Sequence, residues 1–231
     1  MISDDARALL SASDVIDMHV DGYIWRRAFG YDLRKRHGLG LLGGRFYGHL
    51  DFPRARSAGL TGAMWSITTN PLRTQAGRWQ TFQRNLDGLE ALCKSDPTQV
   101  RLVRTLSEYR AARAAGLHAC LPAIQGGNAI DGAPLGAASI RDRLITRVTL
   151  VHLSNSQLGV TSSPAAGARR HHGLTPAGRA LVEQLDTERI FVDLAHMNRA
   201  GFWDAVACHD RALPLLATHT GVTGVLDHWR N

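Results

Sequence analysis

The chain has 231 residues, of which 44% are hydrophobic, and its 27 Lys and Arg residues against 20 Asp and Glu residues give a formal net charge of +7. This length suffices for one well-buried domain and leaves little for a second, so we expect residues 1–231 to form a single domain. The arginines are dispersed, and the densest basic cluster, at residues 34–37, lacks a recognisable nucleic-acid-binding motif. We therefore expect that cluster to be a solvated loop, and we expect no nucleic-acid partner.

Cysteine spacing and hydropathy exclude two further classes of protein. Cys93, Cys120 and Cys208 are widely spaced and form no CxxC pair, so we predict reduced thiols rather than a disulfide framework or a cysteine-rich zinc site. The acidic start is not followed by a long apolar stretch, and the chain contains no run of about 18 apolar residues that could span a bilayer. These features predict a cytoplasmic location and no membrane span.

Short apolar runs alternate with helical stretches along the chain, which is typical of βα units with parallel strands. By this pattern we expect about seven strands. In chain order they are residues 15–20, 60–68, 100–105, 119–125, 147–153, 190–195 and 213–218. Helices are predicted at residues 79–93, where leucines recur at helical intervals, and at 177–185, which follow Thr175 as a cap and Pro176.

Long connections follow the first and fifth predicted strands, at residues 23–59 and 154–173. Loops of this length in a compact domain usually serve as lids or binding loops. A closed (β/α)8 barrel needs eight strands and typically about 250 residues, and our strand count falls one short. Either the architecture closes differently or the chain is a C-terminally shortened product. We predict an α/β fold, a TIM-like (β/α)8 barrel that is truncated after the seventh strand and lacks its C-terminal part.

Metal-ligating side chains follow three of the predicted strands. His19 and Asp21 are alternate residues at the end of the first strand, so they point the same way and can bind one metal ion. His196 and His219 end two later strands, and the C-terminal ends of barrel strands meet at one mouth. A metal held there would polarise a carbonyl and lower the pKa of a bound water, as amide hydrolysis requires. A single strand-end histidine is more often structural, but three with an aspartate predict a metallohydrolase site.

Other polar residues have two open interpretations. His152 ends the fifth strand and would either stabilise an oxyanion or be a packed strand histidine. Arg230 offers a fork suited to a carboxylate, or is an ordinary surface arginine. Strict alternation turns Asp193 away from His196, so it is predicted to support the site or to face a helix. The remaining histidines that we expect at the surface are His37, His49, His118, His171, His172 and His209.

Several segments recur in an order that resembles a known family. They are residues 17–21 (DMHVD), 51–54 (DFPR), 59–65, 173–179 (GLTPAGR), 192–196 (VDLAH), 218–220 (THT) and 230–231 (RN). Together they resemble the membrane (renal-type) dipeptidase family, peptidase family M19, among the metal-dependent amidohydrolase-like barrels. The resemblance covers nearly the whole chain.

The resemblance implies a binuclear zinc centre, with His19 and Asp21 on one ion and His196 and His219 on the other. It also implies a homodimer. By the same resemblance, His152 would stabilise the tetrahedral intermediate and Arg230 would hold the dipeptide carboxylate. In such enzymes a glutamate bridges the metals, whereas this chain has Gln125, whose neutral amide removes a negative charge, so we expect one or two zinc ions with the second in doubt. The last family strand, with its proton-handling aspartate, has no counterpart here.

Two hypotheses follow. The first is a zinc-dependent dipeptidase-like hydrolase that cleaves the peptide bond of dipeptides, or of related small amides, by metal-activated water, weakened by Gln125 and the short C-terminus. The second is a catalytically inactive relic, or a small-molecule binding protein, on the same scaffold.

Overall fold

The computed structural model describes residues 3–38 and 48–230. The chain divides into two compact units, and each is described by itself. Unit 1 holds residues 1–66 and 86–122, and unit 2 holds residues 67–85 and 123–231. The expectation of a single domain stays a prediction.

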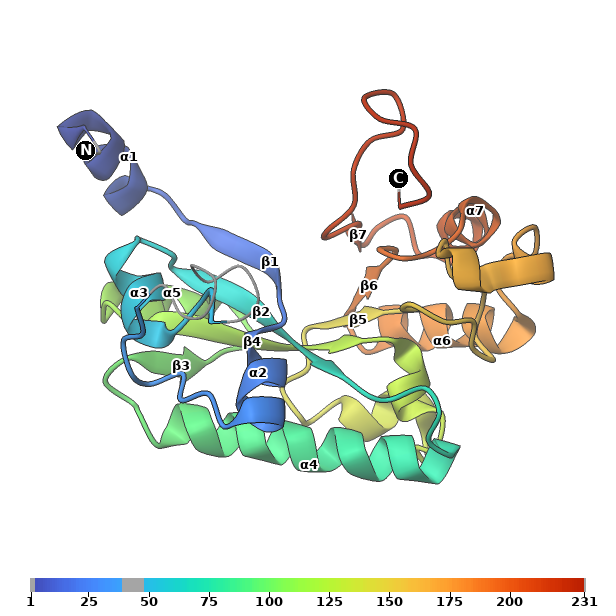
Figure 1. The fold of residues 1–231 in the computed structure, drawn as a ribbon, viewed down its shortest axis with the longest axis horizontal. Coiled ribbons are helices and arrows are strands. Elements are labelled where there is room, and N and C mark those ends of the chain that lie inside the picture. Colours follow the sequence, from blue (N-terminus) through green and yellow to red (C-terminus); the bar gives the residue numbers. More distant parts are fainter. Residues whose placement is uncertain (1–2, 39–47, 231) are drawn as a thin grey trace. The chain divides into compact units, whose positions relative to one another are not determined.

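The strands form parallel pairs in the order β1-β2-β4-β5-β6-β7, with β3 pairing on β4 (Figure 1). Their bounds are β1 Ile16–Val20, β2 Gly62–Thr68, β3 Val100–Leu102, β4 His118–Gln125, β5 Arg147–Thr149, β6 Phe191–Asp193 and β7 Leu215–Leu216. Each predicted strand is present, although most are shorter than predicted. The α/β class is confirmed. Apart from β3, which pairs on β4 outside this path, the strands follow one another in chain order, as in a partial TIM-like β/α barrel.

Unit 1 contains the first five residues of β2, 62–66, and all seven residues of this strand are buried. Parallel strands with both faces covered read as continuous apolar runs, and the β2 sequence GAMWSIT does so. The helices of this unit are α1 Asp4–Ala12, α2 Gly22–Phe29, α3 Phe52–Ser57 and α5 Leu106–Ala114. The predicted open connection at residues 23–59 is therefore wrong in part, because α2 and α3 lie within it; its residues 39–47 lie outside the described part.

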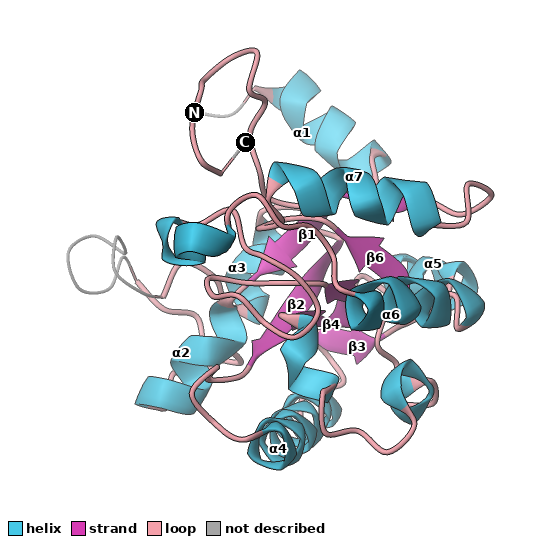
Figure 2. Cartoon of the chain, turned by 90° about the vertical axis from the view of Figure 1, so that its right-hand side faces the viewer, coloured by secondary structure: helices cyan, strands magenta, loops and turns pink. Residues whose placement is uncertain are grey.

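Unit 2 contains the ends of the later strands and two helices that pack on one another, α6 Pro176–Thr187 and α7 Arg199–Cys208 (Figure 2). Helix α6 confirms the predicted helix: Thr175 caps it through the Gly178 amide and Pro176 begins it. A Cβ on Gly178 would lie 2.9 Å from the carbonyl carbon of Leu158, so only glycine fits there.

Between these elements unit 2 has three 3-10 helices, η2 Gly127–Ile130, η3 Gly136–Ile140 and η4 Pro164–Arg169. The predicted loop at 154–173 is irregular apart from η4 and an isolated bridge at Thr161. Helix α4, Gln75–Lys94, contains the predicted helix 79–93 and contributes residues to both units.

Two histidines predicted at the surface are buried. His118 is fully buried in unit 1, where Trp65 Nε1 donates to its Nε2 at 3.1 Å and Leu60 O lies 3.1 Å from its Nδ1. Burial lowers its pKa to about 4. His209 is buried in unit 2 with Nδ1 at 2.8 Å from Asp186 Oδ1. Both predictions failed because the compensating partner comes from a distant part of the sequence.

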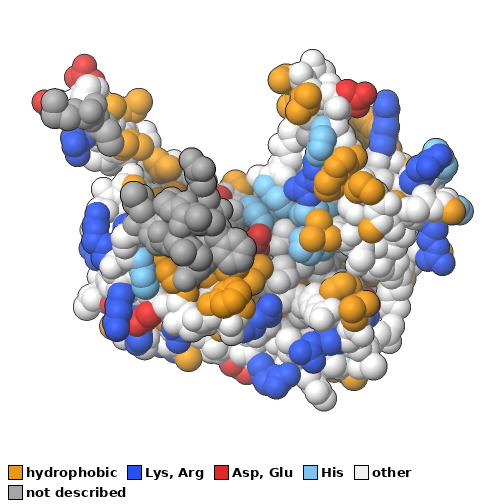
Figure 3. Space-filling model, viewed as in Figure 1, with side chains coloured by type: hydrophobic (Ala, Val, Ile, Leu, Met, Phe, Trp, Pro, Cys, Tyr) orange, Lys and Arg blue, Asp and Glu red, His pale blue; other side chains and the backbone are white. Residues whose placement is uncertain are grey.

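Of the other four histidines predicted at the surface, three are exposed. His49, His171 and His172 are exposed, whereas His37 is half-buried and stacks on Tyr31 with ring centroids 4.0 Å apart. The basic residues 34–36 are exposed, and on the face drawn in Figure 3 the Lys and Arg side chains are dispersed rather than gathered. The three cysteines are free thiols, as predicted. Of the described helices, none is long and apolar enough to cross a bilayer. The cytoplasmic location stays a prediction.

Candidate metal centre

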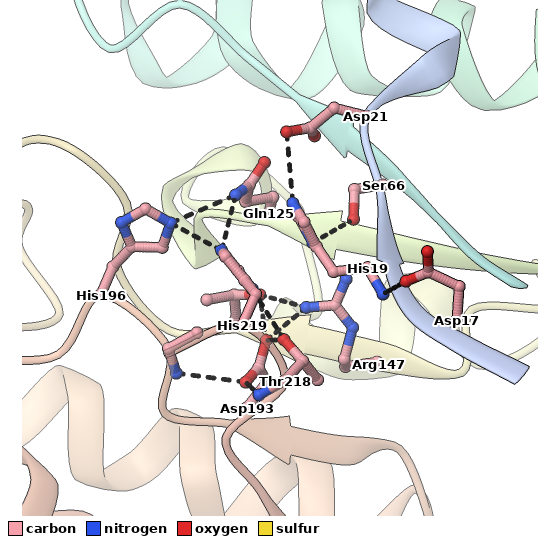
Figure 4. Close-up of polar contacts among 12 residues, drawn as sticks. Asp17, His19, Asp21, Ser66, Gln125, Arg147, Asp193, His196, Thr218 and His219 are labelled. Atoms are coloured by element: carbon pink, nitrogen blue, oxygen red, sulfur yellow. Dashed lines mark hydrogen bonds and ion pairs between the residues drawn. The ribbon is translucent and has the colours of Figure 1, made fainter. Parts of the chain in front are cut away.

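Three side chains converge at the ends of the unit 2 strands (Figure 4). Nε2 of His196 lies 2.9 Å from Nε2 of His219, and the amide Nε2 of Gln125 lies 3.3 Å from the first and 3.4 Å from the second. Gln125 is the last residue of β4, and the two histidines follow β6 and β7. Because these strands are parallel, their carboxyl ends lie at one edge of the sheet.

The local backbone turns His196 away from the strand direction. Its φ is +67°, a left-handed conformation that is uncommon for a residue with a side chain and is often found at functional sites. His196 is buried, and its carbonyl accepts the Ser162 amide at 2.7 Å. The strained turn is therefore held in place by the loop at residues 154–173.

The donor atoms fit one imidazole-binding metal ion. Zinc bound tetrahedrally by nitrogen at about 2.0–2.1 Å has its donors about 3.3–3.4 Å apart. The separations from Gln125 to the two histidines match that edge, and the distance between the histidines is somewhat shorter. Turning the amide by about 180° would present its carbonyl oxygen instead of its nitrogen. All three donors are formally neutral, so they suit one dication better than two.

A buried polar network lies behind these donors. Asp193, fully buried on β6, accepts from Thr149 Oγ1 at 2.6 Å and Thr218 Oγ1 at 2.9 Å, and it forms an ion pair with the fully buried Arg147. Burial acts to raise the pKa of Asp193, but the Arg147 guanidinium and the hydroxyl and amide donors outweigh it, so the pKa lies below its usual value. The prediction that Asp193 supports the site agrees with this arrangement.

Arg147 is a site residue that sequence reasoning missed. In the sequence it is only the first residue of the predicted strand 147–153, and arginine side chains are mostly exposed. Its partner Asp193 is 46 residues away, although register places Thr149 beside Asp193 on the neighbouring strand. A polar residue at alternate positions of an otherwise buried strand was the available signal.

Arg230 and His152 both approach His196. Nη1 of Arg230 contacts both ring nitrogens of His196, and Nη2 donates to the His219 carbonyl at 2.9 Å. Burial lowers the pKa of Arg230 from its ordinary value. The His152 ring lies 4.6 Å from the His196 ring at 86°, an edge-on contact. Arg230 therefore contacts the candidate site and is not an ordinary surface arginine.

The other predicted ligand pair lies in unit 1. His19 Nε2 is 3.2 Å from Asp21 Oδ2, and Ser66 Oγ lies 3.1 Å from His19 Nδ1. Asp17 Oδ1 accepts the His19 amide at 2.9 Å and so fixes the backbone at the end of β1. Asp17, His19 and Asp21 line a cavity of about 300 Å³ together with Trp25 and neighbouring residues.

Within each unit, then, the structure brings one predicted ligand pair together: His19 with Asp21, and His196 with His219. Over residues 3–38 and 48–230, no three His, Cys, Asp or Glu side chains are grouped so as to hold a metal ion by themselves. A single centre made from all four ligands stays a prediction.

Parallel βα units with imidazoles at the strand ends define an α/β protein of the β/α-barrel type. Comparison with known proteins agrees. The chain is 25% identical over 233 residues to the dipeptidase aclJ of Aspergillus oryzae, covering 96% of this chain and 54% of that protein. The chain spans about half the length of the curated relatives it matches.

Two solved structures share the fold. The probable dipeptidase PvdM of Pseudomonas aeruginosa aligns with a TM-score of 0.82 at 17% identity, over 98% of this chain and 57% of that one. A metallopeptidase of Rhodobacter sphaeroides, liganded with a phosphinate mimic of L-Ala-D-Ala, aligns with a TM-score of 0.78 at 22% identity, over 94% and 68%. The model of the membrane dipeptidase family, peptidase family M19, matches residues 3–231, and the chain belongs to that family.

Proposed function

We propose that the chain is a zinc-dependent dipeptidase-like hydrolase that acts on dipeptides or related small amides. The observation that carries the proposal is the convergence of Gln125, His196 and His219 at spacings suited to one tetrahedral ion. Family membership supports the same conclusion, since the curated relative named above is a dipeptidase by description. Zinc, when bound, would supply Lewis-acid polarisation of the scissile carbonyl and of a water molecule.

The chain's own residues have separate tasks in this proposal. The His152 imidazole, edge-on to His196, would donate a hydrogen bond to the oxyanion that develops on the carbonyl. Arg230 would hold the free carboxylate of the dipeptide by a bidentate contact. To do so, its guanidinium would exchange its contacts with His196 for the carboxylate.

The ligands of the second ion would be His19 and Asp21. Their 3.2 Å separation between Nε2 and Oδ2 is close to a tetrahedral edge, and the carboxylate supplies one negative charge. Because Gln125 is neutral and adds no negative charge beside His196 and His219, we propose that one zinc ion is bound tightly, at this histidine pair.

The test combines metal analysis with turnover. Metal-free protein is titrated with Zn²⁺ by calorimetry, and release of amino acids from L,L and L,D dipeptides is followed with and without a chelator. We expect His219→Ala to lose both zinc and turnover, while His171→Ala, at an exposed position, keeps both. Turnover that survives the chelator or the His219→Ala change would refute the metal-dependent hydrolase.

A second candidate, a non-catalytic small-molecule binding protein, is favoured by one observation. The Arg230 guanidinium contacts both ring nitrogens of His196, and a cation beside a ligand disfavours a dication there. Binding of a dipeptide without turnover, under every divalent metal tested, would favour this candidate over the hydrolase.

A further inference from the structure

We propose that Asp193 is a positioning residue that aims both histidines at one point and sets the tautomer of His219. The part about metal holding rests on the proposed function, whereas the orientation and the tautomer are properties of the metal-free chain. Asp193 itself contacts neither imidazole; it acts through the backbone of two strand ends and through the hydroxyl of Thr218 (Figure 4).

The backbone contacts tie the two histidine-bearing segments together. Oδ1 of Asp193 accepts the Ala195 amide at 3.1 Å and the Thr218 amide, also at 3.1 Å. Ala195 and Thr218 directly precede His196 and His219 in the sequence. One carboxylate oxygen therefore fixes both chain segments at the residue before the histidine, which restricts where each imidazole can point.

The hydroxyl contact decides the direction of the hydrogen bonds. A carboxylate paired with Arg147 only accepts, so the single proton of the Thr218 hydroxyl is donated to Asp193 Oδ2, at 2.9 Å. Toward His219 Nδ1, at 2.8 Å, that hydroxyl oxygen can then only accept. The proton of the neutral imidazole accordingly lies on Nδ1.

This tautomer leaves a lone pair on His219 Nε2, the atom that faces His196 and Gln125. Metal-binding histidines commonly donate their other ring N–H to an acceptor that fixes the tautomer. A Thr218 hydroxyl released from Asp193 could instead donate to Nδ1, which would move the proton to Nε2 and block the coordinating atom. Asp193 thus keeps His219 ready to bind a cation before any cation arrives.

A matched pair of variants at the hydroxyl tests the inference with little change in shape. Thr218→Val removes the hydroxyl, and Thr218→Ser keeps it. Thr149→Val is the control, because Thr149 is buried and also donates to Asp193 Oδ2, while its hydroxyl oxygen accepts from Arg147 Nη1 at 2.5 Å. Circular dichroism and thermal unfolding verify that each variant folds.

The readout is the ¹⁵N spectrum of histidine-labelled, metal-free protein at a pH where the imidazole is neutral, with the His219 signal assigned by its loss in His219→Ala. We expect the Nδ1–H tautomer in the unaltered protein, in Thr218→Ser and in Thr149→Val, and a shift toward Nε2–H in Thr218→Val. Zinc affinity should fall about 10- to 100-fold in Thr218→Val and much less in the control.

An Nε2–H tautomer in the unaltered protein, or an unchanged tautomer in Thr218→Val, would overturn the inference. The outcome is separable from the proposed function: the tautomer pattern with no zinc binding would retain the positioning role and refute the metal site. Zinc binding by a protein whose His219 has the Nε2–H tautomer would support the metal site and refute the positioning role.

Discussion

Burial of His118 predicts a defined loss of stability on mild acidification. The imidazole is fully buried between Trp65 and the Leu60 carbonyl, and desolvation lowers its pKa from 6.5 to about 4. An unfolded chain takes up this proton near its ordinary pKa, whereas the folded chain resists it until a lower pH. The contribution is therefore fully present above pH 6.5 and is lost as the pH falls from 6.5 toward 4.

The magnitude follows from the two pKa values. Each pH unit within that interval costs about 1.4 kcal/mol of unfolding free energy, so the loss from this group is about 2 kcal/mol at pH 5 and about 3 kcal/mol by pH 4. Carboxylates contribute their own pH dependence, so the useful quantity is the difference in slope between two proteins. His118→Gln retains polarity but cannot titrate in this range.

The assay is urea unfolding at several pH values between 7 and 5, by far-UV circular dichroism. We expect the unaltered protein to lose about 2 kcal/mol more than His118→Gln over that range. His171→Gln, at an exposed position, should keep the slope of the unaltered protein. Equal slopes for the unaltered protein and His118→Gln would refute the assignment of a depressed pKa to this group.

Three further predictions concern the polar residues of unit 2. Gln125→Glu should raise tightly bound zinc from about one ion toward two, measured by mass spectrometry of metals, because it adds a negative charge beside His196 and His219; two ions in the unaltered protein would contradict this. Arg230→Ala should tighten zinc binding about tenfold, measured by calorimetry, because the variant lacks the positively charged guanidinium that contacts His196; unchanged affinity would count against that contact. Arg147→Leu should cost about 3–5 kcal/mol in urea unfolding by leaving Asp193 buried and unpaired, and Asp193→Leu in addition should restore much of it; equal stability of the single and double variants would refute the pairing.

The strands were predictable because each is a short apolar run with polar residues at its end. Residues 62–68 within β2 and 118–125 within β4 are buried almost throughout, as continuous apolar runs of parallel strands should be. Pairing length was harder to predict: residues 213–218 have strand character, yet only Leu215–Leu216 pair with β6. Composition records apolar character but not how far a neighbouring strand extends.

The site was predictable only in part, because its support depends on partners distant in sequence. His196 and His219 could be proposed from their place after apolar runs. Arg147 could not, since its burial is tolerable only with Asp193 on the next strand. The burial of His118 likewise depends on Trp65, 53 residues away. In each case a polar side chain is interior because a remote group satisfies it.

The charges around His196 predict that cation and carboxylate binding assist one another. Gln125, His196 and His219 carry no formal negative charge, and Arg230 adds a positive one against His196. A dication that enters there is repelled until the Arg230 guanidinium leaves His196 and pairs with an anion. The carboxylate of a substrate is an anion suited to that pairing. By linkage, a carboxylate that draws Arg230 away must tighten zinc binding by the same factor by which zinc tightens the carboxylate.

Calorimetric zinc titrations with and without a non-hydrolysable dipeptide analogue measure this coupling. We expect at least about fivefold tighter zinc binding with the analogue, corresponding to about 1 kcal/mol, and no coupling in Arg230→Ala. An analogue whose carboxylate is amidated serves as the matched control, because it cannot pair with the guanidinium. Coupling that persists in Arg230→Ala, or with the amidated analogue, would show that another group than Arg230 links the two ligands.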